Sequence, residues 1–248
     1  MPSTALITGA GSGIGRACAH ALLKEGWQLT LLGRRHEALL ETAAAAPDQC
    51  LVLPCDVSIE AQVQQAFAAT AQHFGRLDLL FNNAGGGLGA KLPDDITGDE
   101  WRAVIDVNLN GAFYCMREAF ALMRQQTPQG GRIINNGSLS ATVPRPQSMA
   151  YAVSKHAITG LTRAAALDGR AFNIAVGQID IGNAATELTE GLAKPPGALQ
   201  ADGSRRPEAR LDLGAVTDTF MAMARLPLSA NVLFMTVMAT GMPYVGRG

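Results

Sequence analysis

Two side chains that could move a proton lie four residues apart, at Tyr151 and Lys155. They fall within a helical pattern over Met149–Leu167, so this spacing places them on one face, one turn apart. A phenol holds its proton firmly at neutral pH. An ammonium at about 4 Å would stabilise the phenolate by roughly 4 kcal/mol at an effective dielectric of about 20. The pair could therefore act as a general acid and base, although the spacing alone also arises by chance.

A hydroxyl stands thirteen residues before the tyrosine, at Ser138. It directly follows the predicted strand Arg132–Gly137, where a donor could hydrogen-bond a substrate carbonyl and stabilise charge developing on its oxygen. Ser140 is the alternative for this role. A serine after a strand is otherwise usually a cap, so its value as a catalytic signal depends on the residues around it.

A glycine-rich turn opens the chain. The predicted strand Thr4–Thr8 runs directly into the sequence GAGSGIG, and a predicted helix follows. Glycines let the backbone approach a pyrophosphate closely, and a helix N-terminus directs N–H groups and a positive dipole toward it. Strand, turn and helix in this order predict a dinucleotide site, the alternative being a tight turn without a ligand. The expected contacts are Gly9, Ser12, Gly13, Ile14 and Gly15.

The end of the second predicted strand, Gln28–Gly33, bears on the choice of dinucleotide. An acid at this place would select NAD, but the chain has Arg34 and Arg35 there. An arginine can form charge-assisted bonds to a 2′-phosphate, worth roughly 1.5–3 kcal/mol or about 10- to 150-fold in affinity. We therefore expect NADP(H) as the preferred cofactor, with Arg34 as the first choice of contact and Arg35 as the second. NAD(H) remains the alternative.

Apolar runs alternate with helical patterns along the whole chain. This alternation predicts an α/β doubly wound Rossmann fold: a single domain over residues 1–248, with about seven parallel strands flanked by helices. The other expected strands are Cys50–Pro54, Leu77–Asn82, Asn173–Gln178 and Val232–Met238. The expected helices are Gly13–Glu25, Glu37–Ala45, Glu60–Phe74, Glu100–Gln126, Met149–Leu167 and Leu213–Arg225.

One segment interrupts the alternation. Residues Gly182–Asp212 are rich in glycine, proline, alanine and charge. A long late insertion in a compact domain is usually a mobile lid or a disordered loop, and we expect a substrate lid. The stretches Gly85–Lys91 and Leu139–Met149 predict a mainly apolar pocket, with Arg145 near its rim.

Composition excludes several classes of function. Hydrophobic residues make up 48% and charged residues 17% of the chain, and the net charge is -1. This profile is typical of a folded protein and offers no basic excess for nucleic acid, so we expect no nucleic-acid partner. The uncharged stretch Leu226–Val245 is interrupted by proline and glycine, and we read it as a buried strand with turns. No membrane partner is therefore expected.

The four cysteines form no C-x-x-C pair, and reduced thiols in a cytoplasm are the simplest interpretation. The N-terminus lacks a cationic region before Arg16, which also argues against a secretory signal and favours a cytoplasmic protein. Cys50 and Cys55 could bind a metal, but no matching histidine or second cysteine pair lies nearby, so we expect no metal.

Together, these motifs resemble the short-chain dehydrogenase/reductase family in its classical form. The resemblance rests on TGxxxGxG, which begins at Thr8, on the Asn-Asn-Ala-Gly run that ends at Gly85, and on the spacing of Ser138, Tyr151 and Lys155. It covers nearly the whole chain, from Thr4 to the last predicted strand. It implies a fourth catalytic residue, Asn108, which in the family holds a water that links the lysine to solvent.

The resemblance also implies further cofactor contacts. Asp56, followed by Val57, would accept from the adenine amino group, and the backbone at Asn83, Ala84 and Gly85 would pass the adenosine ribose. Lys155 would bind the nicotinamide ribose beside Tyr151. Gly182 and Thr186 match positions near the nicotinamide amide, but Ile181 stands where relatives usually have proline.

The function implied is reversible hydride transfer between NADP(H) and a carbonyl or secondary alcohol substrate, with Tyr151 as general acid and base. An NAD-dependent secondary alcohol dehydrogenase of the same family is one alternative. A non-catalytic dinucleotide-binding regulator is another, and an epimerase or dehydratase of the family is a third. The family also suggests a homotetramer or homodimer formed through Glu100–Gln126 and Met149–Leu167. The sequence does not identify the substrate.

Overall fold

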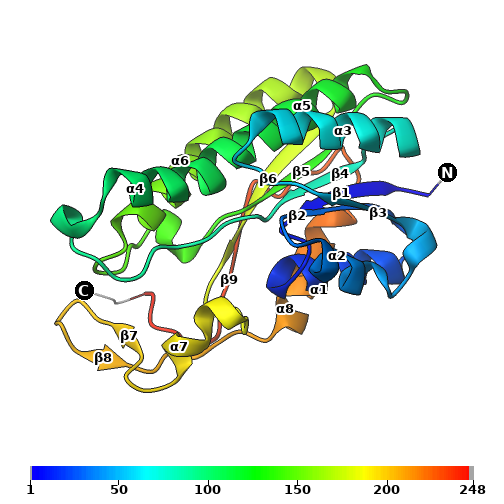
Figure 1. The fold of residues 1–248 in the computed structure, drawn as a ribbon. Coiled ribbons are helices and arrows are strands. Elements are labelled where there is room, and N and C mark those ends of the chain that lie inside the picture. Colours follow the sequence, from blue (N-terminus) through cyan, green and yellow to red (C-terminus); the bar gives the residue numbers. More distant parts are fainter. Residues whose placement is uncertain (1, 246–248) are drawn as a thin grey trace.

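Seven parallel strands form the central sheet, in the order β3-β2-β1-β4-β5-β6-β9 (Figure 1). The strands are β1 (Thr4–Thr8), β2 (Gln28–Gly33), β3 (Cys50–Pro54), β4 (Leu79–Asn82), β5 (Gly131–Asn136), β6 (Ile174–Ile181) and β9 (Phe234–Val237). Strand order reverses between β1 and β4, and in such sheets the crevice beyond the carboxyl ends at this point binds ligands. The predicted doubly wound α/β fold is confirmed.

The structure is a computed structural model that describes residues 2–245. Met1 and Gly246–Gly248, at the two ends of the predicted domain, lie outside the described residues. Within residues 2–245, no helix combines the length and the apolar character that crossing a bilayer would require.

Two helical layers cover the sheet (Figure 1). The helices α1 (Gly13–Lys24), α2 (His36–Ala43) and α8 (Leu213–Ala224) pack on one face, in a core that includes Leu22 and Phe220. The helices α3 (Glu60–Phe74), α5 (Gly111–Gln125) and α6 (Met149–Asp168) pack on the other, in a core that includes Val63 and Cys115. Apolar side chains therefore cover both sheet faces, which explains why the strands read as continuous apolar runs. Short 3₁₀ turns lie at Pro47–Gln49, Pro93–Asp95, Leu139–Ala141 and Gly169–Phe172.

Strand β6 is longer than its predicted span. We expected it to end at Gln178, but it continues to Ile181 because β9 pairs with it over residues 178–181. The added hydrogen bonds keep the backbone extended where the sequence alone indicated a loop. Asp180 therefore lies inside a strand of the central sheet. Strand β4 also begins at Leu79 rather than at the predicted Leu77.

The helix predicted over Glu100–Gln126 is interrupted. It consists of α4 (Gly98–Ile105), a π-helical turn (Asp106–Asn110) and α5. The wide turn places the Asn108 side chain against the Gly86 backbone. It also brings Gly111 close to the segment that follows β3. A Cβ on Gly111 would lie 2.7 Å from Val57 Cγ2. A π-turn of this kind is frequent at functional sites, and these two contacts explain the break.

The predicted lid segment carries its own secondary structure. It contains a 3₁₀ turn (Glu187–Thr189), α7 (Glu190–Ala193) and an antiparallel hairpin of β7 (Ala198–Leu199) and β8 (Arg205–Arg206). Figure 1 shows this segment in yellow beyond one end of the sheet. An isolated bridge between Ala184 and Leu211 joins its two ends. The segment thus begins and ends next to the carboxyl end of β6.

The two cysteines that could have shared a metal lie on opposite faces of the sheet. Cys50 packs with the α1–α8 core and Cys55 with the α3–α5 core. Burial raises the pKa of both thiols to about 11, so both stay protonated at neutral pH. Among the described residues, no group of three or more His, Cys, Asp or Glu side chains could hold a metal ion.

Candidate active site

One large cavity of about 1030 Å³ runs along the carboxyl ends of the strands. It extends from Arg34 after β2, past the glycine turn, to Tyr151 on α6. Most of the predicted site residues line it: Gly9, Ser12, Gly13, Ile14, Arg34, Arg35, Asp56, Val57, Asn83, Ala84, Gly85, Ser138, Tyr151, Lys155, Gly182 and Thr186. Two predicted residues, Gly15 and Asn108, lie outside the lining.

The glycine turn connects β1 to α1 in a conformation that leaves donors available. Gly9 and Gly13 have φ angles of 65° and 52°, which favour glycine. Ser12 is the N-cap of α1, yet its hydroxyl makes no cap hydrogen bond, and the first turn of the helix carries no acid. The N-terminus of α1 therefore combines unneutralised positive dipole with a free hydroxyl, an arrangement suited to an anion.

Gly15 has a packing role in the glycine turn. A Cβ on this residue would lie 2.2 Å from the Gly9 carbonyl oxygen and 2.6 Å from Asn83 Nδ2. Only a glycine lets α1 approach the end of β1 this closely. The prediction of Gly15 as a cofactor contact is thus not supported by the cavity lining, although the residue shapes the turn that would make the contact.

Asn83 joins three strand ends. Its Nδ2 donates to the Thr8 carbonyl oxygen at 2.9 Å, and its Oδ1 accepts from Asn136 Nδ2 at 2.9 Å. The Thr8 hydroxyl oxygen accepts from the backbone N–H groups of Asn83 and Ala84 at 2.9 and 2.8 Å. These bonds hold the ends of β1, β4 and β5 together beneath the middle of the cavity.

The end of the cavity near β2 and β3 has charged side chains that could hydrogen-bond to a ligand. Arg34 and Arg35 are exposed, and neither guanidinium bonds to any group within residues 2–245. Arg16 also lines the cavity, but it donates to the Gly11 and Ala38 carbonyl oxygens and pairs with Glu41. Arg16 is therefore committed to the protein, whereas the two predicted arginines are available to a ligand.

Asp56 lies at the same end, after β3. One oxygen of its carboxylate accepts from the Ser58 backbone N–H at 3.0 Å and from the Ser58 hydroxyl at 2.7 Å. The Asp56 backbone N–H donates to Gln62 Oε1 at 2.8 Å. The carboxylate is thus fixed at the cavity wall by a short local turn.

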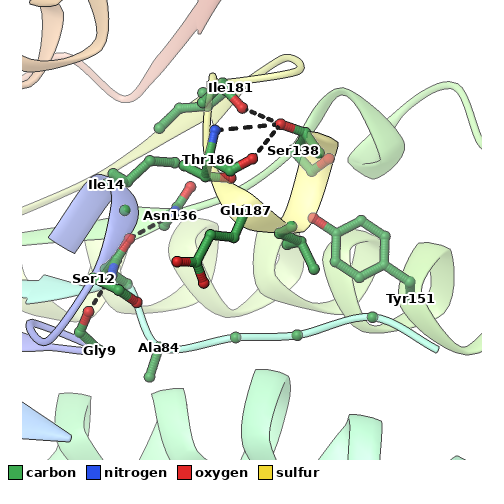
Figure 2. Close-up of a pocket in the computed structure, with 18 of the residues that line it drawn as sticks. Gly9, Ser12, Ile14, Ala84, Asn136, Ser138, Tyr151, Ile181, Thr186 and Glu187 are labelled. Atoms are coloured by element: carbon green, nitrogen blue, oxygen red, sulfur yellow. Dashed lines mark hydrogen bonds between the residues drawn. The ribbon is translucent and has the colours of Figure 1, made fainter. Parts of the chain in front are cut away.

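The other end of the cavity gathers the predicted acid–base residues. Lys155 is buried, its Nζ donates to the Asn136 carbonyl oxygen at 2.7 Å, and it lies 5.6 Å from the centroid of the Tyr151 ring. Figure 2 shows the Tyr151 hydroxyl directed into the cavity on the side of Ser138. Ser138 Oγ accepts from the Ser140 N–H at 3.1 Å. Helix α6 and the turn after β5 therefore bring these predicted residues together.

Asn108 lies behind the cavity wall. Its Oδ1 accepts from the Gly86 N–H at 2.9 Å, and its Nδ2 donates to the Gly86 carbonyl at 2.8 Å and to Ser154 Oγ at 3.0 Å. A Cβ placed on Gly85 would lie 3.2 Å from Asn108 Oδ1 and 3.8 Å from Lys155 Nζ. Asn108 is therefore close to the lysine, but its side chain is saturated by protein groups.

Sequence reasoning missed one buried acid, Asp180. It is 8% exposed, and its Oδ1 accepts from the Ser138 backbone N–H at 2.9 Å. Burial raises the pKa of Asp180, while hydrogen bonds and the Lys155 charge act in the opposite direction. A single acid in an apolar strand was the signal available in the sequence. The predicted end of the strand at Gln178 concealed it, since that boundary placed Asp180 in a loop.

An ion pair fastens the predicted lid to the rest of the site. Arg145 lines the cavity and pairs with Glu208 at 2.6 Å, where the glutamate side chain is 1% exposed. Both residues also bond to Asn183, just beyond β6. Arg145 was expected near the pocket rim, but its buried acidic partner had no signal in the sequence. Nearby, the Thr186 methyl lies 3.1 Å from where a Cβ on Gly13 would be, so the start of the lid covers the glycine turn.

A family model described as short chain dehydrogenase matches residues 3–196. The chain is similar to a 3beta-hydroxysteroid dehydrogenase of Mediterraneibacter gnavus, with 39% identity over 188 residues, 75% of this chain and 67% of that protein.

Solved structures share the fold. A closed form of serine dehydrogenase complexed with NADP+ superposes with a TM-score of 0.86 at 24% identity, covering 99% of this chain and 98% of that one. A 3-ketoacyl-(acyl-carrier-protein) reductase from Brucella melitensis complexed with NADH gives 0.84 at 24% identity, covering 96% and 97%. At this identity the two structures establish the fold alone.

Proposed function

Because the chain belongs to the short chain dehydrogenase family of oxidoreductases, we propose that it transfers a hydride between NADP(H) and a carbonyl or secondary alcohol. Tyr151 would be the general acid and base. One observation carries the proposal: Ser138, Tyr151 and Lys155 meet at one end of a cavity whose middle is the glycine turn. A dinucleotide and a small substrate would then lie end to end.

The residues along the cavity fit such a cofactor. The free N-terminus of α1, with Ser12 and Gly13, would hold the pyrophosphate. Asp56 would bind the adenine amino group, and Lys155 the nicotinamide ribose. Gly182 and Thr186 would stand near the nicotinamide amide. When bound, NADP(H) supplies or accepts the hydride, and the protein provides the rest of the chemistry.

We favour the phosphorylated cofactor on the basis of Arg34. Its guanidinium is exposed at the β2 end of the cavity, without a protein partner within residues 2–245, and the two residues that directly follow β2 are both arginines. Arg35 is the second candidate for the contact. NAD(H) is the alternative, and solved structures of the same fold are described with either cofactor.

During reduction, the Ser138 hydroxyl would donate to the substrate carbonyl and stabilise the negative charge that develops on its oxygen. Tyr151 would then give its proton to that oxygen. Lys155 would stabilise the phenolate that remains, since its buried ammonium is held beside the ring by the Asn136 carbonyl. Oxidation of an alcohol would use the same steps in reverse, with the phenolate accepting the proton.

The substrate end of the cavity supports a substrate with an apolar body. The cavity lining includes apolar side chains from the turn after β5, from the predicted lid and from the segment after β9: Leu139, Val143, Leu188, Leu192 and Met242. Arg145 is also there, but Glu208 balances its charge. A family relative that acts on a 3beta-hydroxysteroid is compatible with a substrate of this kind.

We also propose that residues 182–212 act as a lid. Figure 2 shows the Glu187 carboxylate directed into the cavity on the side of Ser12. A carboxylate and a pyrophosphate repel each other, so this exposed side chain would turn away when the cofactor binds. Slower hydrogen exchange in residues 187–212 after addition of NADPH would support the lid, and unchanged exchange would contradict it.

Exposed apolar side chains on the long helices support a homodimer or homotetramer. Phe113 on α5 is 44% exposed, and Met149, Val153 and Leu167 on α6 are 44%, 44% and 60% exposed. Aromatic residues and methionine are enriched where subunits meet.

The four cysteines are free thiols, which favours a reducing compartment such as the cytoplasm.

A panel of apolar ketones and secondary alcohols, assayed with NADPH, NADP+, NADH and NAD+, tests the proposal. We expect turnover of at least one ketone and at least tenfold higher kcat/KM for NADPH than for NADH. Equal efficiency with the two cofactors would contradict the role of Arg34. Tight NADPH binding with no turnover of any compound would instead favour a non-catalytic regulator.

A further inference from the structure

A buried carboxylate beside the acid–base residues has no part in the reaction as described. Asp180 lies on β6, and only 8% of the residue is exposed. Burying a carboxylate costs free energy unless hydrogen bonds or opposite charge compensate. The chain therefore carries a destabilising group at a place where the neutral side chains typical of this strand would pack without that cost.

The carboxylate is directed at the turn that carries Ser138. Asp180 Oδ1 accepts from the Ser138 backbone N–H at 2.9 Å. Gly137 gives it room, because a Cβ there would lie 2.0 Å from Asp180 Oδ1. Ser138 is thus held from two sides, by this bond on its N–H and by the bond between its hydroxyl oxygen and the Ser140 N–H.

The same oxygen is also tied to α6, the helix that carries Tyr151 and Lys155. Gln178 Nε2 donates to Asp180 Oδ1 at 2.8 Å and to Thr159 Oγ1 at 3.1 Å. Gln178 Oε1 in turn lies 3.0 Å from Thr162 Oγ1. A short chain of buried hydrogen bonds therefore links the serine turn to the helix of the tyrosine. Lys155, the charged group that faces Asp180 from α6, adds a favourable electrostatic interaction.

We propose that Asp180 is a positioning residue of this site. Its carboxylate oxygen sets the place of Ser138 relative to Tyr151, so that both hydroxyls meet the same substrate oxygen. This inference rests on the proposed function. Asp180 is not among the residues that line the cavity, so it would act through Ser138, as an acceptor rather than through proton transfer.

A pair of variants separates the acceptor from the charge. Asp180→Ala removes the acceptor, and we expect kcat to fall by about 10- to 100-fold, since small misplacement of a reacting group has effects of this size. Asp180→Asn keeps an oxygen at the same place, and we expect kcat within about threefold of the wild type. NADPH affinity should be unchanged in both. A kcat for Asp180→Asn as low as that of Asp180→Ala would overturn the proposal.

A double-mutant cycle with Ser138→Ala then tests whether the effect passes through the serine. If it does, Asp180→Ala should lower kcat by less than about threefold in the Ser138→Ala background. Full additivity would mean that Asp180 supports the fold in general, and it would contradict the positioning role. Should Asp180→Ala fail to fold, Asp180→Val, which also lacks an acceptor, replaces it in the same cycle.

Hydrogen exchange at the Ser138 amide provides a readout that does not depend on activity. We expect exchange in residues 137–141 to be at least tenfold faster in Asp180→Ala than in the wild type, and near wild type in Asp180→Asn. If the wild type reduces no carbonyl, the proposed function fails, yet this exchange result still tests the contact. If the wild type is active and Asp180→Ala matches it in kcat and exchange, only the inference about Asp180 fails.

Discussion

The two ends of the cavity are built differently. At the proposed catalytic end, Asn108, Lys155 and Asp180 are 2%, 5% and 8% exposed, and each bonds to protein groups at 2.7–3.0 Å. At the proposed nucleotide end, Arg34 and Arg35 are exposed and make no bonds to protein within residues 2–245. Protein groups therefore hold these three polar side chains in place, whereas the two arginines are not held by other residues.

This difference follows from what each end must do. Acid–base and oxyanion groups work best when they are fixed before the reaction, because reorganisation during the reaction costs rate. A phosphate contact can instead be formed on binding, at the expense of side-chain entropy. Substitutions at the catalytic end should therefore change both rate and stability, whereas substitutions at the nucleotide end should change only cofactor affinity.

The largest effect is expected for Lys155→Met at the catalytic end. Turnover should fall by about 10³-fold or more, in the range reported for loss of general acid–base catalysis. The melting temperature should also fall, because the Asn136 carbonyl loses its donor and the buried Asp180 carboxylate loses the favourable charge of Lys155. Initial rates and thermal unfolding measure the two effects, with Lys24→Met on the exposed end of α1 as the control. Retained turnover would contradict the role of the lysine.

Arg34→Ala should affect cofactor choice alone. We expect kcat/KM for NADPH to fall by about 10- to 150-fold, while the value for NADH and the melting temperature stay within experimental scatter. Arg170→Ala, an exposed arginine away from the cavity, serves as the matched control. An equal loss with both cofactors would mean that the residue supports the loop after β2 and does not read the phosphate.

Asn108→Ala should lower kcat about tenfold, and it should also lower the stability of the fold. The half-buried Gly86 backbone and the buried Ser154 hydroxyl would lose a partner, and an unpaired buried polar group costs about 1–3 kcal/mol. Asn110→Ala is the control in the same π-helical turn, since within residues 2–245 its side chain bonds only to Asp106. Equal melting temperatures and equal kcat values for the two variants would contradict a role of Asn108 in the site.

The smallest effect concerns Asp180 and pH. Burial raises its pKa, so between about pH 4 and that raised value the folded protein binds more protons than the unfolded chain, and stability falls as pH rises. Asp180→Asn removes this loss of stability at high pH, and the melting temperature of the variant at pH 8 should exceed the wild-type value. Each kcal/mol gained corresponds to about 2–4 °C. Thermal unfolding from pH 4 to 8 measures this, and a parallel profile for the two proteins would contradict it.

Much of this organisation could be predicted from the sequence. A doubly wound parallel sheet follows from alternating elements and handed crossovers, and the glycine turn and the Tyr151–Lys155 pair are local patterns. The family prediction is confirmed by the match over residues 3–196. These features depend on residues close together in the chain, where periodicity is a direct guide.

Features set by contacts between distant segments could not be predicted. Strand β6 extends to Ile181 only because β9 pairs with it, and this pairing is what places Asp180 beneath Ser138. The π-helical turn at Asn108 depends on Gly86, and the burial of Arg145 depends on Glu208, 63 residues away. Each of these pairings forms across the fold and leaves little trace in the local pattern.

The catalytic role of Tyr151 is the central claim, and Tyr151→Phe tests it most directly. The variant keeps the ring beside Lys155 and removes only the hydroxyl, so NADPH should bind with unchanged affinity by fluorescence titration. Turnover of the best ketone from the substrate panel should fall by at least about 10³-fold, while Tyr114→Phe on α5 should match the wild type. A Tyr151→Phe enzyme that keeps a tenth or more of wild-type kcat would contradict the account.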